Sequence, residues 1–242
     1  MKTVAKVLGV LLGLLILVAA WPAYQLYGEL QKAASEDPLV WEEDIAALEV
    51  ASRGRFAPDE AIVFVGSSSI RLWDTLPQDM APLPVLQHGF GGAKMHDVVH
   101  YADRLVGAFA PRAVVMFAGT NDVHPGSVKS PQTLLASYQA FVEAVRRDRP
   151  ELPIFFIEIT PSPLRWTVWE DAAAANRLIA QWSATQSGLT VIDTSVGLMG
   201  EDGQPDPDNY LFDGLHLSEQ GYDHWARVIR SALQTGLAPP NG

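Results

Sequence analysis

Five short apolar segments, separated by stretches that favour helices, constrain the fold more than any other feature of this sequence. They are short enough for buried strands and too short for typical helices. The segments are Ala61–Gly66, Val85–His88, Ala113–Gly119, Ile154–Ile159 and Thr190–Asp193. Apolar strands that alternate with helices favour a parallel sheet covered on both faces. Because crossover connections are right-handed, the sequence predicts an α/β fold, a three-layer α/β/α sandwich with a central parallel sheet of about five strands.

The stretches between the apolar segments have the spacing of amphipathic helices. Helices are expected near Met95–Phe109, Pro131–Arg149, Val168–Gln186 and Ser218–Leu233. Together these elements predict one domain over residues 59–237, followed by a flexible tail at 238–242. Residues 28–58 are polar and helix-prone, with a helix start at Asp37-Pro38, and are expected to form a stalk and a capping helix.

The first 27 residues predict a membrane anchor or a signal segment. Lys2 and Lys6 precede the almost wholly apolar stretch Val7–Ala23. As a transmembrane helix this stretch would span roughly 25 Å, the short end of what crosses a bilayer. Pro22 disfavours the alternative, a cleaved signal peptide. Both readings leave the lysines in the cytoplasm, so the domain is expected on the periplasmic or extracellular side, membrane-anchored or secreted after cleavage.

Charge and composition exclude several classes of function. The net charge of -11 argues against nucleic acid as a partner, because phosphate groups bind basic surfaces. The chain has no cysteine, which excludes a thiol nucleophile and disulfides. His96 and His100 lie four residues apart and would share a helix face, but no third ligand is apparent. We therefore expect no metal and no cofactor.

Polar residues collect where the predicted strands end, which is where function gathers in parallel sheets. The first strand runs into Gly66–Ser69, and Asn121 follows the third strand in "GTND". Asp213 could bind the near ring nitrogen of His216 and leave the other nitrogen free to accept a proton. Each pattern alone also fits an ordinary turn or, before Ser218, a helix start. These residues alone leave the choice among the three serines open.

Four such blocks in this order resemble the SGNH hydrolases, also called the GDSL esterase/lipase family, from about Ala61 to Leu233. The opening "GSSSIRLW" itself resembles a subgroup of these enzymes. The matching residues are Ser68 in "GSSS", Gly92 in "GFGGA", Asn121 in "GTND", and Asp213 and His216 in "DGLH". The resemblance implies Ser68, two residues after Gly66, as the nucleophile.

Three positions depart from the family pattern. Ser67 stands in place of the Asp of the name-giving block, and Ser69 stands in place of its Leu. Neither position belongs to the triad. Gln87 replaces the Asn that opens the second block in many members, and we expect it to change how that loop is held.

The resemblance also implies a mechanism. His216, oriented by Asp213, takes the proton of Ser68, and an acyl-enzyme forms. The backbone NH groups of Ser68 and Gly92 and the side chain of Asn121 would form the oxyanion hole. The expected function is therefore that of a serine esterase.

Short-chain acyl or O-acetyl esters, including those on carbohydrates, are the expected substrates. Trp166 and Trp169 follow the fourth strand and are candidates for a substrate-binding wall, with packing under a loop as the alternative. Other readings are a lysophospholipase or thioesterase, a catalytically silent carbohydrate-binding module on the same fold, and a flavin-binding protein of flavodoxin type.

Overall fold

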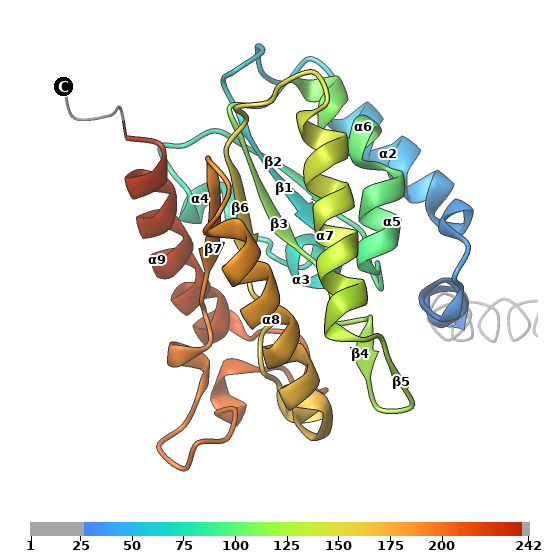
Figure 1. Cartoon of the computed structure of the whole chain (residues 1–242), viewed down its shortest axis with the longest axis vertical. Helices are drawn as coiled ribbons and strands as arrows, with labels where there is room; N and C mark the ends of the chain where they lie inside the picture. The colour runs from blue at the N-terminus through green and yellow to red at the C-terminus, as the bar shows by residue number, and fades with distance from the viewer. Residues whose placement is uncertain (1–26, 239–242) are drawn as a thin grey trace, which may run out of the picture.

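The computed structural model describes residues 27–238, which form a five-stranded sheet with the order β2-β1-β3-β6-β7 (Figure 1). Every neighbouring pair of strands is parallel, as in the register of Ile62 with Val85. The predicted α/β fold with a parallel sheet of five strands is confirmed. The strands are β1 Ile62–Gly66, β2 Val85–Gly89, β3 Ala113–Phe117, β6 Ile154–Ile157 and β7 Leu189–Ile192.

Helices cover both faces of the sheet (Figure 1). All five residues of β1 are buried, so alternate side chains enter two separate cores. Ile62 and Phe64 pack with α9 (Glu219–Gly236) and α4 (Leu76–Asp79). Val63 and Val65 belong to the other core. That core is covered by α2 (Glu42–Ser52), α5 (Met95–His100), α6 (Ala102–Leu105), α7 (Pro131–Arg146) and α8 (Trp169–Ser183).

Two local features differ from the sequence prediction. The single helix expected over Met95–Phe109 is divided into α5, α6 and the 3-10 turn η2 (Gly107–Phe109). Tyr101 separates α5 from α6, since its buried ring packs edge-on against Phe90. A short hairpin, β4 (Val123–His124) and β5 (Ser127–Val128), follows β3 and was not expected.

The segment before the sheet packs against the domain. Residues 27–34 are helical, and Asp37 caps the 3-10 turn η1 (Pro38–Trp41) by accepting a hydrogen bond from the Leu39 NH. Trp41 and, in α2, Ile45 are fully buried in the core. The part of the predicted stalk and capping-helix segment that contains Trp41 and α2 thus packs on the domain.

No helix within residues 27–238 has both the length and the apolar character needed to cross a membrane. The apolar stretch predicted as an anchor, Val7–Ala23, lies outside the described residues. So does nearly all of the predicted tail.

A close approach of two strands explains the glycine at the end of β1. Gly66 has a φ of +150°, and a Cβ atom there would lie 1.9 Å from the carbonyl oxygen of Phe117. The Ser67 NH instead donates to that oxygen at 3.0 Å. The chain then turns directly into α3 (Ser68–Arg71), a one-turn helix that begins at Ser68.

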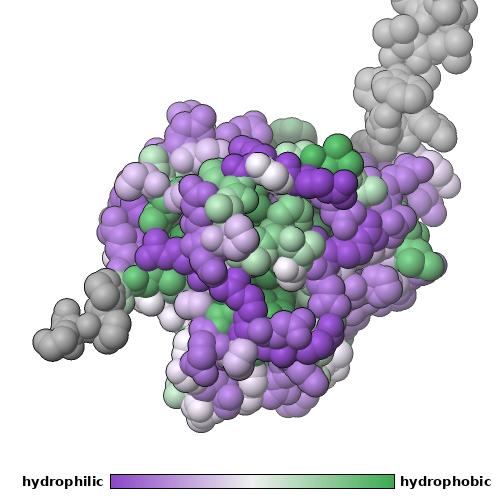
Figure 2. All heavy atoms as spheres, turned by 90° about the horizontal axis from the view of Figure 1, so that it is seen from above, coloured by the Kyte–Doolittle hydropathy of each residue, from purple (hydrophilic) through white to green (hydrophobic). Residues whose placement is uncertain are grey.

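The end of the molecule opposite the carboxyl ends of the strands is shown in Figure 2. Hydrophilic residues cover most of this face, with apolar residues grouped near its centre. The candidate site lies at the other end, where the five strands finish and helices α7, α8 and α9 begin (Figure 1).

Glu158, directly after β6, is expected to make the free energy of unfolding depend on pH. Burial, with a smaller contribution from Asp193, raises the pKa of Glu158 to about 7. The folded protein keeps this proton up to about pH 7, whereas the unfolded chain releases it near pH 4.5. The unfolded state therefore binds fewer protons in this window, and the group lowers the free energy of unfolding as pH rises through it.

We expect Glu158→Gln to remove that loss, so the variant gains stability relative to wild type between pH 5 and pH 8. Urea unfolding at both pH values measures the difference. Glu143→Gln, at an exposed position on α7, is the matched control and should show the same gap at both. An equal gap for Glu158→Gln would contradict the prediction.

Candidate active site

The turn that carries Ser68 is fastened from two sides. Gln87 on β2 donates its side-chain NH₂ to the carbonyl oxygens of Ile70, at 2.7 Å, and Trp73, at 3.0 Å. From α9, the Tyr222 hydroxyl donates to the carbonyl oxygen of Ser69 at 2.9 Å. Gln87, expected to change how the loop after β2 is held, therefore secures the end of α3 instead.

Asp213 and His216 share a tight loop just before α9. The Leu211 NH donates to the carbonyl oxygen of His216 at 2.7 Å and closes the loop. One carboxylate oxygen of Asp213 accepts the backbone NH groups of Leu215, at 2.9 Å, and His216, at 3.0 Å. The other lies 2.7 Å from Nδ1 of His216. Partial burial opposes ionisation, but these hydrogen bonds hold the pKa of Asp213 below its ordinary value.

Ser68 completes a continuous chain of hydrogen bonds with this loop. Its Oγ lies 2.9 Å from Nε2 of His216, although 148 positions separate the two residues in sequence. An ionised Asp213 accepts the Nδ1 proton, so the lone pair of Nε2 faces the serine hydroxyl. The Asp213 and His216 side chains are 33% and 24% exposed, so solutes can reach the arrangement.

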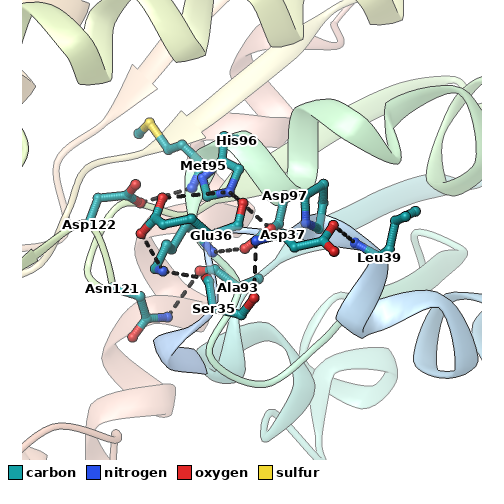
Figure 3. A network of polar contacts seen from close by, with 12 residues as sticks. Ser35, Glu36, Asp37, Leu39, Ala93, Met95, His96, Asp97, Asn121 and Asp122 are labelled. Atoms are coloured by element: carbon teal, nitrogen blue, oxygen red, sulfur yellow. Dashed lines mark hydrogen bonds and ion pairs between the residues drawn. The ribbon is translucent and has the colours of Figure 1, made fainter. Parts of the chain in front are cut away.

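Gly92 and Asn121 flank the serine turn, because their loops follow β2 and β3, the two neighbours of β1 in the sheet. Gly92 has a φ of +77°, a conformation that favours glycine. Asn121 donates one amide hydrogen to the carbonyl oxygen of Ala93 at 3.0 Å, which leaves the second hydrogen available (Figure 3). Within residues 27–238, the NH groups of Ser68 and Gly92 have no hydrogen-bond acceptor.

Trp166 and Trp169 stack on each other beside this site, with ring centroids 6.3 Å apart. Trp166 belongs to the 3-10 turn η3 (Pro163–Val168), and Trp169 begins α8. The turn contacts the Asp213–His216 loop, because the Leu164 NH donates to the carbonyl oxygen of Gly214 at 2.9 Å. Trp169 also packs against the core, and the substrate-binding role of the pair stays a prediction.

Several charged residues beside the site were not singled out from the sequence. Lys94 follows the glycine pair, Asp122 follows Asn121, and Lys129 follows the β4–β5 hairpin. All three join Glu36 in one network, of which Figure 3 labels Glu36 and Asp122. Among these residues, only Asp122 could have been singled out from the sequence, because it directly follows Asn121. Across the described part of the chain, no cluster of three or more acidic and histidine side chains is arranged to hold a metal ion.

The Ser68–His216–Asp213 arrangement at the ends of the sandwich strands has the hydrogen-bond pattern of a serine hydrolase triad. A model of the GDSL-like lipase/acylhydrolase family matches residues 52–224, and the chain belongs to this family. It is therefore an enzyme that hydrolyses carboxylic esters, as the sequence motifs indicated.

Individual proteins are similar to this chain in sequence or in fold. The human platelet-activating factor acetylhydrolase IB subunit alpha1 is 26% identical over 193 residues, which cover 75% of this chain and 78% of that protein. Among solved structures, a GDSL-like lipase from Bacteroides thetaiotaomicron has a TM-score of 0.65 at 19% identity, covering 83% of this chain and 98% of its own. A lipase/acylhydrolase from Enterococcus faecalis has a TM-score of 0.60 at 20% identity, covering 76% and 100%.

Proposed function

We propose that this protein is a serine esterase that hydrolyses short-chain acyl or O-acetyl esters through Ser68, His216 and Asp213. The observation that carries the proposal is the unbroken chain from Ser68 Oγ to His216 Nε2, at 2.9 Å, and from His216 Nδ1 to Asp213, at 2.7 Å. A binding module has no need for this series of hydrogen bonds. A base within hydrogen-bond reach of a hydroxyl, itself oriented by a carboxylate, is the arrangement that makes serine nucleophilic.

In the proposed reaction, His216 Nε2 takes the hydroxyl proton while Ser68 Oγ bonds to the ester carbonyl carbon. The carbonyl oxygen becomes an oxyanion. His216 then gives its proton to the leaving alkoxide, the carbon–oxygen bond breaks, and the acyl group stays on Ser68. Water attacks this acyl-enzyme with His216 as base, releasing the acid and restoring the serine.

We assign the oxyanion to the NH groups of Ser68 and Gly92 and the free amide hydrogen of Asn121. Asn121→Ala should lower kcat by roughly 10²- to 10³-fold with little change in KM, since such donors act mainly on the transition state. Steady-state kinetics measure both values. His124→Ala, in the nearby β4–β5 hairpin, is the control and should keep its activity. A change confined to KM would contradict the assignment.

The small size of the proposed acyl group is supported by the sequence relatives, which are named acetylhydrolases. A second candidate, a lysophospholipase or thioesterase, is favoured by one structural observation. Leu164, Leu211 and Phe212 are exposed apolar residues next to the Asp213 loop, where they could contact a long acyl chain. Trp166 and Trp169 are proposed as a further wall of the same substrate site.

Hydrolysis of p-nitrophenyl esters from acetate to dodecanoate separates these candidates. The short-chain proposal expects kcat/KM to be highest for acetate or butyrate and to fall with chain length. An optimum at eight or more carbons would favour the lysophospholipase reading. Inertness on every ester, equal in wild type and Ser68→Ala, would favour a binding module.

We also propose that the segment Val7–Ala23 anchors the enzyme in a membrane, with the catalytic domain on the extracytoplasmic side. Support comes from the two lysines before the segment and its unbroken apolar character. The full-length protein should stay with membranes after carbonate washing and dissolve only with detergent. Release by carbonate, or a mass showing cleavage near residue 20, would contradict a retained anchor.

A further inference from the structure

The N-terminal linker, defined here as residues 27–37, lies directly on the loop that carries Gly92. A Cβ atom built on Gly92 would lie 2.7 Å from Cβ of Ala33 and 3.4 Å from the ring of Trp41. The loop therefore has the linker as its outer wall. A shift of the linker toward or away from this loop would move the backbone that carries the Gly92 NH.

Charged contacts fasten the linker to the end of the same loop. Lys94, two residues after Gly92, has a side chain that is only 6% exposed. Its ammonium donates to the carbonyl oxygen of Ser35 at 2.7 Å and to the carboxylate of Glu36 at 2.6 Å. The hydrogen bond from Lys94 lowers the pKa of Glu36, with Lys129 adding to the effect against partial burial. A buried ammonium needs such partners, because an unpaired charge there is costly.

The same Glu36 carboxylate reaches the loop that carries Asn121. Its second oxygen lies 3.2 Å from Nζ of Lys129, and that Nζ lies 3.1 Å from the carboxylate of Asp122. Asp122 is buried, directly follows Asn121, and accepts the Met95 NH at 2.8 Å. Two loops that supply proposed oxyanion donors thus meet at one linker residue.

We propose that the linker is a positioning element for the oxyanion hole and that Glu36 is its principal positioning residue. Glu36 does not touch the reacting atoms; it holds Lys94 and Lys129, and through them the loops of Gly92 and Asn121. This inference rests on the proposed function, because it assigns those two residues to the oxyanion hole. It makes the rate of catalysis depend on a segment outside the sandwich.

The test uses the full-length protein and a p-nitrophenyl ester. Glu36→Gln keeps the shape of the side chain but removes its charge, and Glu36→Lys reverses the charge beside two lysines. We expect kcat to fall roughly 10- to 100-fold, less than for loss of a whole donor, with KM nearly unchanged. Glu36→Lys should show the larger loss. The matched control is Glu43→Gln, at an exposed position in α2, which should match wild type.

A double-mutant cycle with Lys94→Met distinguishes positioning from general destabilisation. If Glu36 acts partly through Lys94, Glu36→Gln should lower kcat less in the Lys94→Met background than in wild type. Thermal unfolding shows whether each variant is folded. Because the Glu36 side chain is 65% exposed, we expect the Glu36 variants to fold.

The inference is overturned if an active wild type and Glu36→Gln have equal kcat, if only KM changes, or if the two substitutions act independently. Inactivity of the wild type on all esters would instead count against the proposed function. The two failures are therefore distinguishable.

Discussion

Ser68→Ala is expected to lower kcat by roughly 10⁴- to 10⁶-fold, to the level that binding and oxyanion stabilisation support alone. The methyl group cannot attack an ester carbonyl, and no other hydroxyl is placed at 2.9 Å from His216 Nε2 within residues 27–238. Rates of p-nitrophenyl acetate hydrolysis, measured with enough protein to detect the residual activity, give the ratio.

Ser67→Ala is the informative control, because Ser67 is the neighbouring serine in the same turn. It is buried and its side chain makes no capping hydrogen bond to α3. Its activity should stay within a few-fold of wild type. Near-complete loss in Ser67→Ala combined with an active Ser68→Ala would reassign the nucleophile.

Asp213→Asn is expected to lower kcat by about 10⁴-fold while leaving the fold intact. The amide oxygen can still accept the NH groups of Leu215 and His216, so the loop keeps its shape. The new NH₂ group, however, donates toward His216 Nδ1. That exchange places the imidazole proton on Nε2, which can then no longer accept the proton of Ser68.

Steady-state kinetics and thermal unfolding of the Asp213→Asn variant test this expectation together. Asp223→Asn, at an exposed position on α9, is the control and should resemble wild type. A loss below about tenfold would show that the carboxylate does not set the tautomer of His216, and the proposed base would need another orienting group.

The centre of the sheet was predictable from sequence because β1, β3 and β6 are continuous apolar runs, as expected when both faces are buried. The candidate site residues could be proposed from sequence because they follow strand ends or, for Asp213 and His216, precede the last helix, and because the motif order resembles a known family. The distance from Ser68 to His216 could not be predicted, since it depends on how α9 packs on the sheet.

Other features left no pattern in the sequence. The division of the helix at Tyr101 depends on tertiary contacts to Phe90 and to the carbonyl oxygen of Pro38. The pair of Glu36 with Lys94 joins residues 58 positions apart, and neither side chain belongs to a recognisable motif. Short ion pairs of this kind depend on how the linker packs, which hydrophobic periodicity does not report.

The strand order separates the proposed reacting groups from two connecting segments of the chain. Ser68, Gly92 and Asn121 follow the three adjacent strands β1, β2 and β3, and the proposed acid–base pair belongs to one loop before α9. The β4–β5 hairpin and η3, which contact each other, lie between these two parts along the chain. Those connecting segments lie outside the three strands whose ends carry the proposed nucleophile and oxyanion donors. An engineer seeking a new substrate range would therefore graft there first and leave the strand ends untouched.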